Sequence, residues 1–152
     1  MADHQLRELK VCEMLRANPH RNICAYHGYL SSAGQTYVGG LCFDRHAMML
    51  GRAADQKISL PADFLDGPDY TLMHLHRLDY AHNHIASWND INPKNLMLSL
   101  NPCGAPVCIL IDFDSCQPLG ERLEKGPTPD WVYPGDVSVA DDDLWALGPM
   151  RE

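Results

Sequence analysis

The fold is best indicated by one stretch of the chain, Trp88-Asn89-Asp90-Ile91-Asn92-Pro93-Lys94-Asn95-Leu96-Met97-Leu98. In it, Asp90 and Asn95 stand in a loop that leads directly into an apolar run. A second apolar run, Ile109-Leu110-Ile111, ends at Asp112. Carboxylate and amide oxygens suit Mg²⁺, and a carboxylate can accept the proton of a hydroxyl. Together the two stretches predict a site that holds Mg²⁺ and orients a hydroxyl for phosphoryl transfer.

Apolar periodicity on either side of this stretch predicts an α+β fold. We expect helices over His4–Ala17, Ala47–Ala54 and Tyr70–Ile85, and strands over Ile23–Leu30, Gln35–Phe43, Leu96–Leu100 and Val107–Asp112. Residues 31–34 indicate the turn of a hairpin between the first two strands. Residues 117–140 favour loops, and Asp141–Gly148 indicates the start of another helix. The expected architecture is a short antiparallel sheet packed against helices.

Composition and charge exclude several classes of protein. A chain of 152 residues with 45% hydrophobic and 21% charged residues is typical of one globular domain. The formal net charge of −8 argues against a surface that binds nucleic acid or an anionic membrane. The first residues lack the apolar core of a signal peptide, and the longest apolar stretches are too short to span a bilayer. We therefore expect an intracellular, cytoplasmic protein without nucleic-acid or membrane contacts.

The cysteine and histidine patterns indicate no disulfide framework and no zinc site. Six cysteines are present without a Cys-x-x-Cys pair, so reduced, buried thiols are expected inside a cell. Four histidines crowd the third expected helix, at positions 74, 76, 82 and 84. On a helix, residues two positions apart point in different directions, and residues two turns apart are too distant to share one ion.

The order of elements and motifs resembles the protein kinase superfamily over nearly the whole chain. The resemblance is carried by Leu6-Arg7-Glu8-Leu9, Pro19-His20-Arg21-Asn22-Ile23, Asp90-x₄-Asn95, Asp112-Phe113-Asp114 and Asp143-Leu144-Trp145-Ala146-Leu147-Gly148. These look like the first regulatory helix and the turn after it, the catalytic loop, the metal-binding motif, and the start of the helix after the activation segment.

The resemblance implies a truncated protein-kinase-like fold, with part of the small lobe and the front half of the helical large lobe. Residues 1–43 would be the small-lobe helix and hairpin, and residues 44–152 an incomplete large lobe. The implied function is ATP- and Mg²⁺-dependent phosphoryl transfer to a Ser/Thr hydroxyl of a protein substrate.

Each matching residue carries a role in the family. Asp90 would be the catalytic base, while Asn95 and Asp112 would be ligands of Mg²⁺. Glu8 would be the helix glutamate that pairs with the strand lysine, and so would support ATP binding indirectly. Asp143 would anchor the backbone of the catalytic loop by hydrogen bonds, which is a structural role.

Several departures from the family pattern predict impaired transfer. The family's Gly-rich loop and strand lysine precede the first helix, where this sequence begins. Trp88 and Asn89 stand where the family has His and Arg, and Asn92 stands where Ser/Thr kinases carry a lysine that neutralises the γ-phosphate. Asp114 replaces the glycine of the metal motif. A non-catalytic, pseudokinase-like module that binds a partner, or a truncated gene product, therefore stays open.

A second enzyme class also stays open. Asn89-Asp90-Ile91-Asn92-Pro93-Lys94-Asn95 with Asp112-Phe113-Asp114 is similar to the catalytic loop and metal motif of small-molecule kinases of the choline and aminoglycoside type. Those enzymes share the Asp and the Asn and lack the lysine of Ser/Thr kinases. The Glu8 helix and the Asp143 motif favour the protein kinase side.

Overall fold

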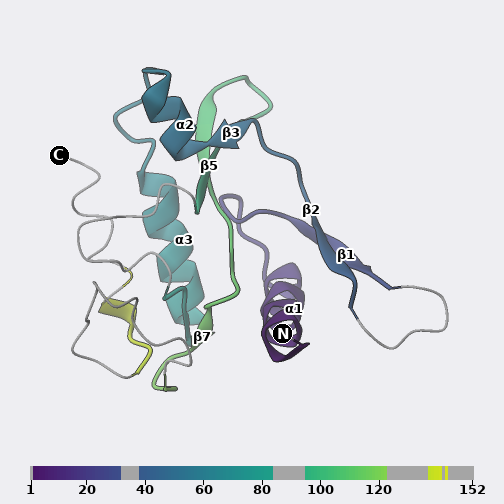
Figure 1. Cartoon of the computed structure of the whole chain (residues 1–152). Coiled ribbons are helices and arrows are strands. Elements are labelled where there is room, and N and C mark those ends of the chain that lie inside the picture. The colour runs from purple at the N-terminus through teal and green to yellow at the C-terminus, as the bar shows by residue number, and fades with distance from the viewer. Residues whose placement is uncertain (1, 32–37, 84–94, 123–136, 142, 144–152) are drawn as a thin grey trace.

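The computed structural model describes residues 2–31, 38–83, 95–122, 137–141 and 143. Within these residues the chain forms three helices and three small antiparallel sheets (Figure 1). The helices are α1 (Ala2–Ala17), α2 (Leu50–Asp55) and α3 (Asp66–Arg77). The strands are β1 (Tyr26–Leu30), β2 (Gly40–Phe43), β3 (Met48–Met49), β4 (Tyr80–Ala81), β5 (Leu96–Leu100), β6 (Pro106–Leu110) and β7 (Gln117–Pro118). The expected α+β class is confirmed.

The central sheet has the order β3-β5-β6 and packs on α3. The strand predicted over Leu96–Leu100 is observed with those bounds, because Leu96 and Leu98 alternate with less buried residues. The next strand was predicted to end at Asp112, but it ends at Leu110. Asp112 has a φ of +66°, which is a left-handed conformation that cannot continue a strand.

The first helix and hairpin also follow the prediction closely. α1 buries Val11, Cys12 and Leu15, whose spacing places them on one face against β1. β1 pairs antiparallel with β2, with Tyr26 opposite Phe43. The hairpin turn predicted at residues 31–34 lies mostly outside the described residues. In Figure 1 this hairpin extends away from α3.

The helix predicted over Tyr70–Ile85 is wrong at both ends. α3 begins earlier, at Asp66, and ends at Arg77. Asp79 has a φ of +61°, and the next two residues form β4, which pairs with β7. The N–H of Leu119 donates to the carbonyl of Asp79, so a segment distant in sequence replaces the helical hydrogen bonds. The short strands β3 and β7 were likewise not predicted.

The turn between α1 and β1 covers the free edge of β6. The N–H of Leu110 donates to the carbonyl of Asn22, and the N–H of Cys24 donates to the carbonyl of Leu110. The buried Asn22 side chain donates from Nδ2 to the carbonyl of Cys108 at 2.8 Å. Edge strands expose unpaired peptide groups, and here the turn satisfies them. The turn therefore joins α1 and its hairpin to the central sheet.

α3 approaches the same turn closely at Gly67. A Cβ built on Gly67 would lie 2.5 Å from Nδ2 of Asn22, which no real contact allows. The glycine in the first turn of α3 is thus required by packing against Asn22 and not by its own backbone conformation.

A histidine pair forms a further contact between this turn and α3. The rings of His20 and His74 stack with centroids 5.2 Å apart, and Nε2 of His74 donates to the carbonyl of Asn18 at 2.8 Å. The N–H of Asn22 donates to Nδ1 of His20, so this nitrogen acts as an acceptor and the ring is neutral. Burial first, and then the neighbouring His74 and Arg21, lower the pKa of His20 from 6.5.

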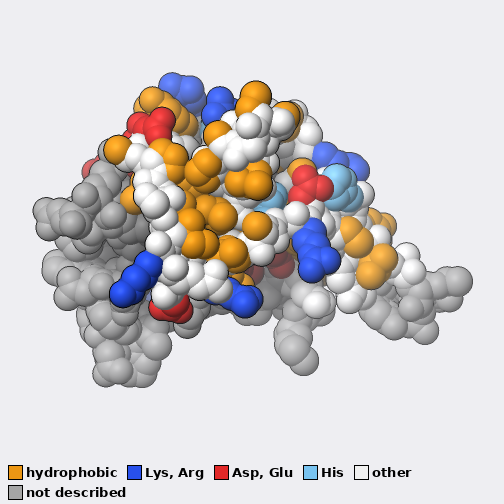
Figure 2. Space-filling model, turned by 90° about the horizontal axis from the view of Figure 1, so that it is seen from above, with side chains coloured by type: hydrophobic (Ala, Val, Ile, Leu, Met, Phe, Trp, Pro, Cys, Tyr) orange, Lys and Arg blue, Asp and Glu red, His pale blue; other side chains and the backbone are white. Residues whose placement is uncertain are grey.

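Apolar side chains gather on the face formed by α2, β3 and the end of β5, which Figure 2 shows from above. The exposed large residues on and next to these elements are Met49, Ile58 and Leu100. Among the described residues, no helix combines the length and the apolar character needed to cross a membrane.

We predict that Gly67→Ala lowers the free energy of unfolding by about 1–3 kcal/mol, because the new Cβ displaces Asn22 from the Cys108 carbonyl. In an Asn22→Ala background the obstacle is gone, and Gly67→Ala should raise stability by up to about 1 kcal/mol through helix propensity. Urea denaturation of the four proteins of this double-mutant cycle measures the coupling. Equal effects of Gly67→Ala in both backgrounds would contradict the proposed contact.

We also predict that His20 makes stability depend on pH below about 6.5. The unfolded chain takes up a proton at His20 near its ordinary pKa of 6.5, whereas the folded chain resists it because the folded pKa is lower. Stability is therefore lost as the pH falls through this range. His20→Gln should lose less stability than the parent between pH 7 and pH 5.5 in urea titrations. Identical slopes for the two proteins would refute the prediction.

Candidate functional site

Asn95 and Asp112 lie at the same end of the β5–β6 pair. Asn95 immediately precedes β5, and Asp112 follows β6 after one intervening residue. The N–H of that residue, Ile111, donates to the carbonyl of Asn95 at 3.0 Å. The antiparallel ladder, in which Leu96 stands opposite Leu110, thus brings together the two residues that the sequence predicted as metal ligands.

The Asn95 side chain is buried, with 3% of its surface exposed, and its Nδ2 has no hydrogen-bond partner among the described residues. Leaving a buried amide donor unsatisfied costs about 1–3 kcal/mol. Such a group is therefore expected to serve a ligand or another segment of the chain.

Asp112 is half-buried and adopts the left-handed φ of +66°. Non-glycine residues in this region carry strain on the order of 1–3 kcal/mol and cluster at functional sites. Asp tolerates the conformation better than most residues because its short side chain can bond locally. This strained turn directs the chain out of β6 immediately beside Asn95.

The next residue, Phe113, is buried and contacts His82. The two rings meet edge to face with centroids 5.4 Å apart, and Nε2 of His82 donates to the carbonyl of Ile111 at 3.2 Å. His82 therefore contacts the residues on both sides of Asp112 and fixes the segment that carries it.

Asp143 holds the backbone of the same region. Its fully buried carboxylate accepts the N–H of His82 at 2.7 Å and the N–H of Asn83 at 2.9 Å. It also accepts Nε2–H of His76, on α3, at 2.9 Å. A buried carboxylate is tolerated only when its oxygens are satisfied, and both oxygens of Asp143 are used here.

The side chain of Asn83 extends this network. Its Nδ2 donates to the carbonyl of Ser115 at 3.0 Å, and its Oδ1 accepts the hydroxyl of Ser138 at 3.0 Å. Asn83 also has a φ of +61°. We call His82, Asn83 and Asp143 the anchor network, since they tie together α3, the Asp112 segment and the segment that carries Asp143.

The other predicted site residues are placed as follows. Asp90 lies outside the described residues, as do Trp88, Asn89 and Asn92. Glu8 lies half-buried in the middle of α1. The pKa of the Cys12 thiol is raised to about 12, first by burial and second by the negative charge of Glu8.

Sequence reasoning missed His82 and Asn83. It matched Trp88 and Asn89 to the positions where the family has His and Arg, and it placed His82 within a predicted helix. Among the described residues, Asp143 binds the backbone of His82 and Asn83, which stand earlier in the chain. The sequence signal for these residues was Tyr80-Ala81-His82, an apolar pair followed by a histidine. The prediction of one continuous helix over this stretch concealed that signal.

Among the described residues, no group of three or more His, Cys, Asp or Glu could hold a metal ion. The pair of Asn95 and Asp112 offers one amide oxygen and one carboxylate. Mg²⁺ commonly takes only one or two carboxylates from a protein and completes its shell with waters and substrate phosphates. Two such ligands are too few for a structural metal site, but they could serve an ion that arrives with a phosphorylated ligand.

Comparison with known proteins gives no family for this chain. No protein-family model matches it, and no curated protein matches it significantly.

We predict that Asp143→Ala lowers the free energy of unfolding by roughly 2–5 kcal/mol, because the buried N–H of His82 and the partly buried N–H of Asn83 lose their acceptor. The matched control is Asp141→Ala, since Asp141 is exposed in the same segment and should change stability by less than about 0.5 kcal/mol. Urea denaturation compares them, and hydrogen exchange should accelerate at His82 and Asn83 only in Asp143→Ala. Equal losses in the two variants would show that the anchor network is unimportant.

Proposed function

We propose that this chain is a protein-kinase-like domain that binds ATP with Mg²⁺ and transfers a phosphoryl group to a Ser/Thr hydroxyl of a protein. The observation that carries the proposal is the placement of Asn95 and Asp112 at the same end of β5–β6, where Ile111, the residue before Asp112, donates its N–H to the carbonyl of Asn95, and Asp112 lies in a left-handed turn. Residues in this backbone conformation cluster at functional sites, and here the conformation stands beside a buried amide.

The two residues supply the oxygen ligands that this chemistry needs. The carboxylate of Asp112 and the amide oxygen of Asn95 would hold Mg²⁺, which neutralises the charge of the nucleotide phosphates when bound. The unsatisfied Nδ2 of Asn95 supports the proposal, because a buried donor at this place is suited to an acceptor in a ligand or in the Asp90 loop. Asp90 would orient the attacking hydroxyl or accept its proton.

The anchor network gives the proposed site its rigidity. Phosphoryl transfer depends mostly on positioning and electrostatic stabilisation, so the residues that hold the reacting groups have to be fixed. Asp143 fixes the backbone at His82 and Asn83, from which the chain leads toward Asp90. His82 in turn bonds to the carbonyl of Ile111, next to Asp112. Asp143 and His82 are positioning residues in this proposal.

The proposed transfer is slow in this chain. Asn92 provides no cation where Ser/Thr kinases carry a lysine, so one source of charge stabilisation in the transition state is lost. Asp114, in place of glycine, adds a negative charge next to Asp112, and its carboxylate accepts the hydroxyl of Ser115 at 3.0 Å. Nucleotide binding is thus expected to survive better than the rate of transfer.

We predict that saturating Mg–ATP raises the thermal unfolding midpoint by roughly 5–10 °C at a hundredfold excess over Kd. Asp112→Asn should abolish the rise. Asn tolerates the left-handed backbone of Asp112, so the fold is kept while the charge of the metal ligand is removed. The control Asp63→Asn, at an exposed residue of the turn before α3, should leave the rise unchanged.

Chelation separates the possible outcomes further. EDTA should reduce the shift with ATP, because the proposed site acts through the cation. A shift without any transfer of labelled phosphate to protein substrates supports the non-catalytic, kinase-like module instead. If Mg–ATP gives no shift in the parent protein, or the same shift in Asp112→Asn, the proposed function is wrong.

A further inference from the structure

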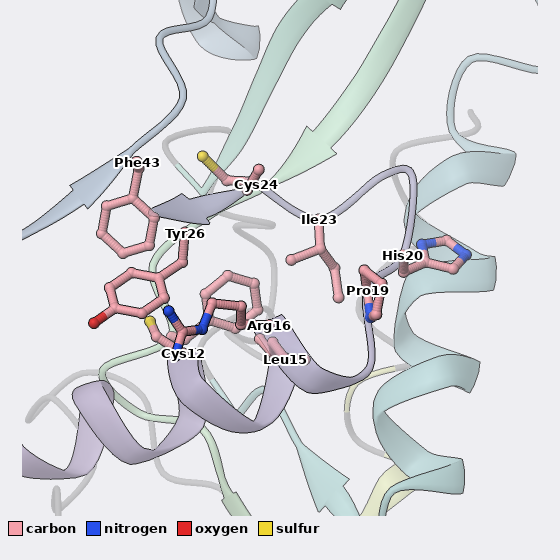
Figure 3. A pocket seen from close by; sticks show the side chains of 11 residues that line it. Cys12, Leu15, Arg16, Pro19, His20, Ile23, Cys24, Tyr26 and Phe43 are labelled. Carbon is pink, nitrogen blue, oxygen red and sulfur yellow. The ribbon is translucent and has the colours of Figure 1, made fainter. Parts of the chain in front are cut away.

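A cavity of about 150 Å³ lies between α1 and the β1–β2 hairpin. Figure 3 shows Leu15 and Ile23 on opposite walls, with the rings of Tyr26 and Phe43 at one end and Pro19 and His20 at the other. Phe113 also lines it. The walls come from α1, from the turn after it and from the hairpin.

The thiols and the phenol that line the cavity are neutral at physiological pH. Burial is the main cause that raises the pKa of the Cys12 thiol to about 12 and that of Cys24 to about 11. Burial and the hydrogen bond to Glu13 raise the pKa of the Tyr26 phenol to about 12. The neighbouring His20 is neutral because its pKa is lowered. The thiols, the phenol and the imidazole of the lining therefore contribute no charge to the cavity.

The one cation among the lining residues, Arg16, is already engaged. Its guanidinium pairs with the carboxylate of Glu13 and lies over the ring of Tyr26, 5.9 Å from the centroid. Its side chain remains 57% exposed, so it stands at the surface and not inside the cavity. Because Glu13 neutralises it, Arg16 offers little attraction to an anionic ligand.

We propose that this cavity is a binding site for a compact, uncharged aromatic molecule of about one ring. The inference goes beyond phosphoryl transfer and uses neither Asp112 nor Asn95. An apolar cavity of about 150 Å³ lined by Leu, Ile and Phe stays dry and accepts benzene in other proteins. Here the volume is similar, and Leu15, Ile23 and Phe113 provide the same kind of wall. An aromatic guest also gains ring contacts with Tyr26 and Phe43.

The test is a titration of the full chain with benzene, followed by methyl NMR. Saturable shifts are expected at the methyls of Leu15 and Ile23, and no comparable shifts at those of Leu72 and Leu98, which are buried away from the cavity. Benzoate, with the same ring and a negative charge, should bind at least tenfold more weakly. Absence of saturation, uniform shifts over all methyls, or tighter binding of benzoate would each overturn the proposal.

Variants give a second, independent readout. Cys12→Leu should fill the cavity and abolish the benzene shifts at Ile23. If that protein does not fold, Ala25→Leu, which enlarges an exposed residue of the lining, serves the same purpose. Ala54→Leu, on the exposed face of α2, is the matched control and should keep the parent affinity. Unchanged benzene binding in a folded, filled variant would overturn the assignment to this cavity.

Discussion

The fold depends on how the turn at Asn22 satisfies the free edge of β6. Asn22 and Cys24 exchange backbone hydrogen bonds with Leu110, and the Asn22 side chain bonds to the carbonyl of Cys108. Without these bonds β6 would keep unpaired peptide groups along this edge, and the turn after α1 would lose its hydrogen bonds to the central sheet. The close approach of Gly67 adds α3 to the same junction. One turn thus sets the relative position of two helices, a hairpin and the central sheet.

The anchor network joins distant segments at the candidate site, as the turn at Asn22 joins them at the edge of β6. Asp143 is fully buried and satisfies two backbone N–H groups and one imidazole, so it fixes three segments that are distant in sequence. His82 extends this network to the residues on either side of Asp112, by a hydrogen bond to Ile111 and a ring contact with Phe113. Burial is also the first cause that raises the pKa of the four buried thiols, so none of them is a reactive thiolate at neutral pH.

The elements that the sequence predicted well are those whose stability is local. Strand β5 follows directly from the alternation of apolar residues over its own length, and α1 was predicted to within two residues of its bounds. The helix predicted over Tyr70–Ile85 failed where tertiary contacts override periodicity. After Arg77 the chain pairs with Gln117–Pro118 and donates a backbone N–H to the Asp143 carboxylate. These tertiary hydrogen bonds take the place of those of a further helical turn. The two-residue strands β3 and β7 were missed for the same reason, since the strands that they pair with, β5 and β4, lie far along the chain.

The sequence by itself determined which residues are candidates for the site. Asp90, Asn95 and Asp112 were predicted from residue type and spacing, and the predicted role of Asp143 came from the resemblance to protein kinases. Only the tertiary structure decided that Asn95 and Asp112 lie at the same end of β5–β6, that Asp112 adopts a left-handed turn, and that Asp143 reaches His82 and Asn83. These facts depend on antiparallel pairing and on burial of a carboxylate, and both join residues too distant in sequence for any local pattern to specify.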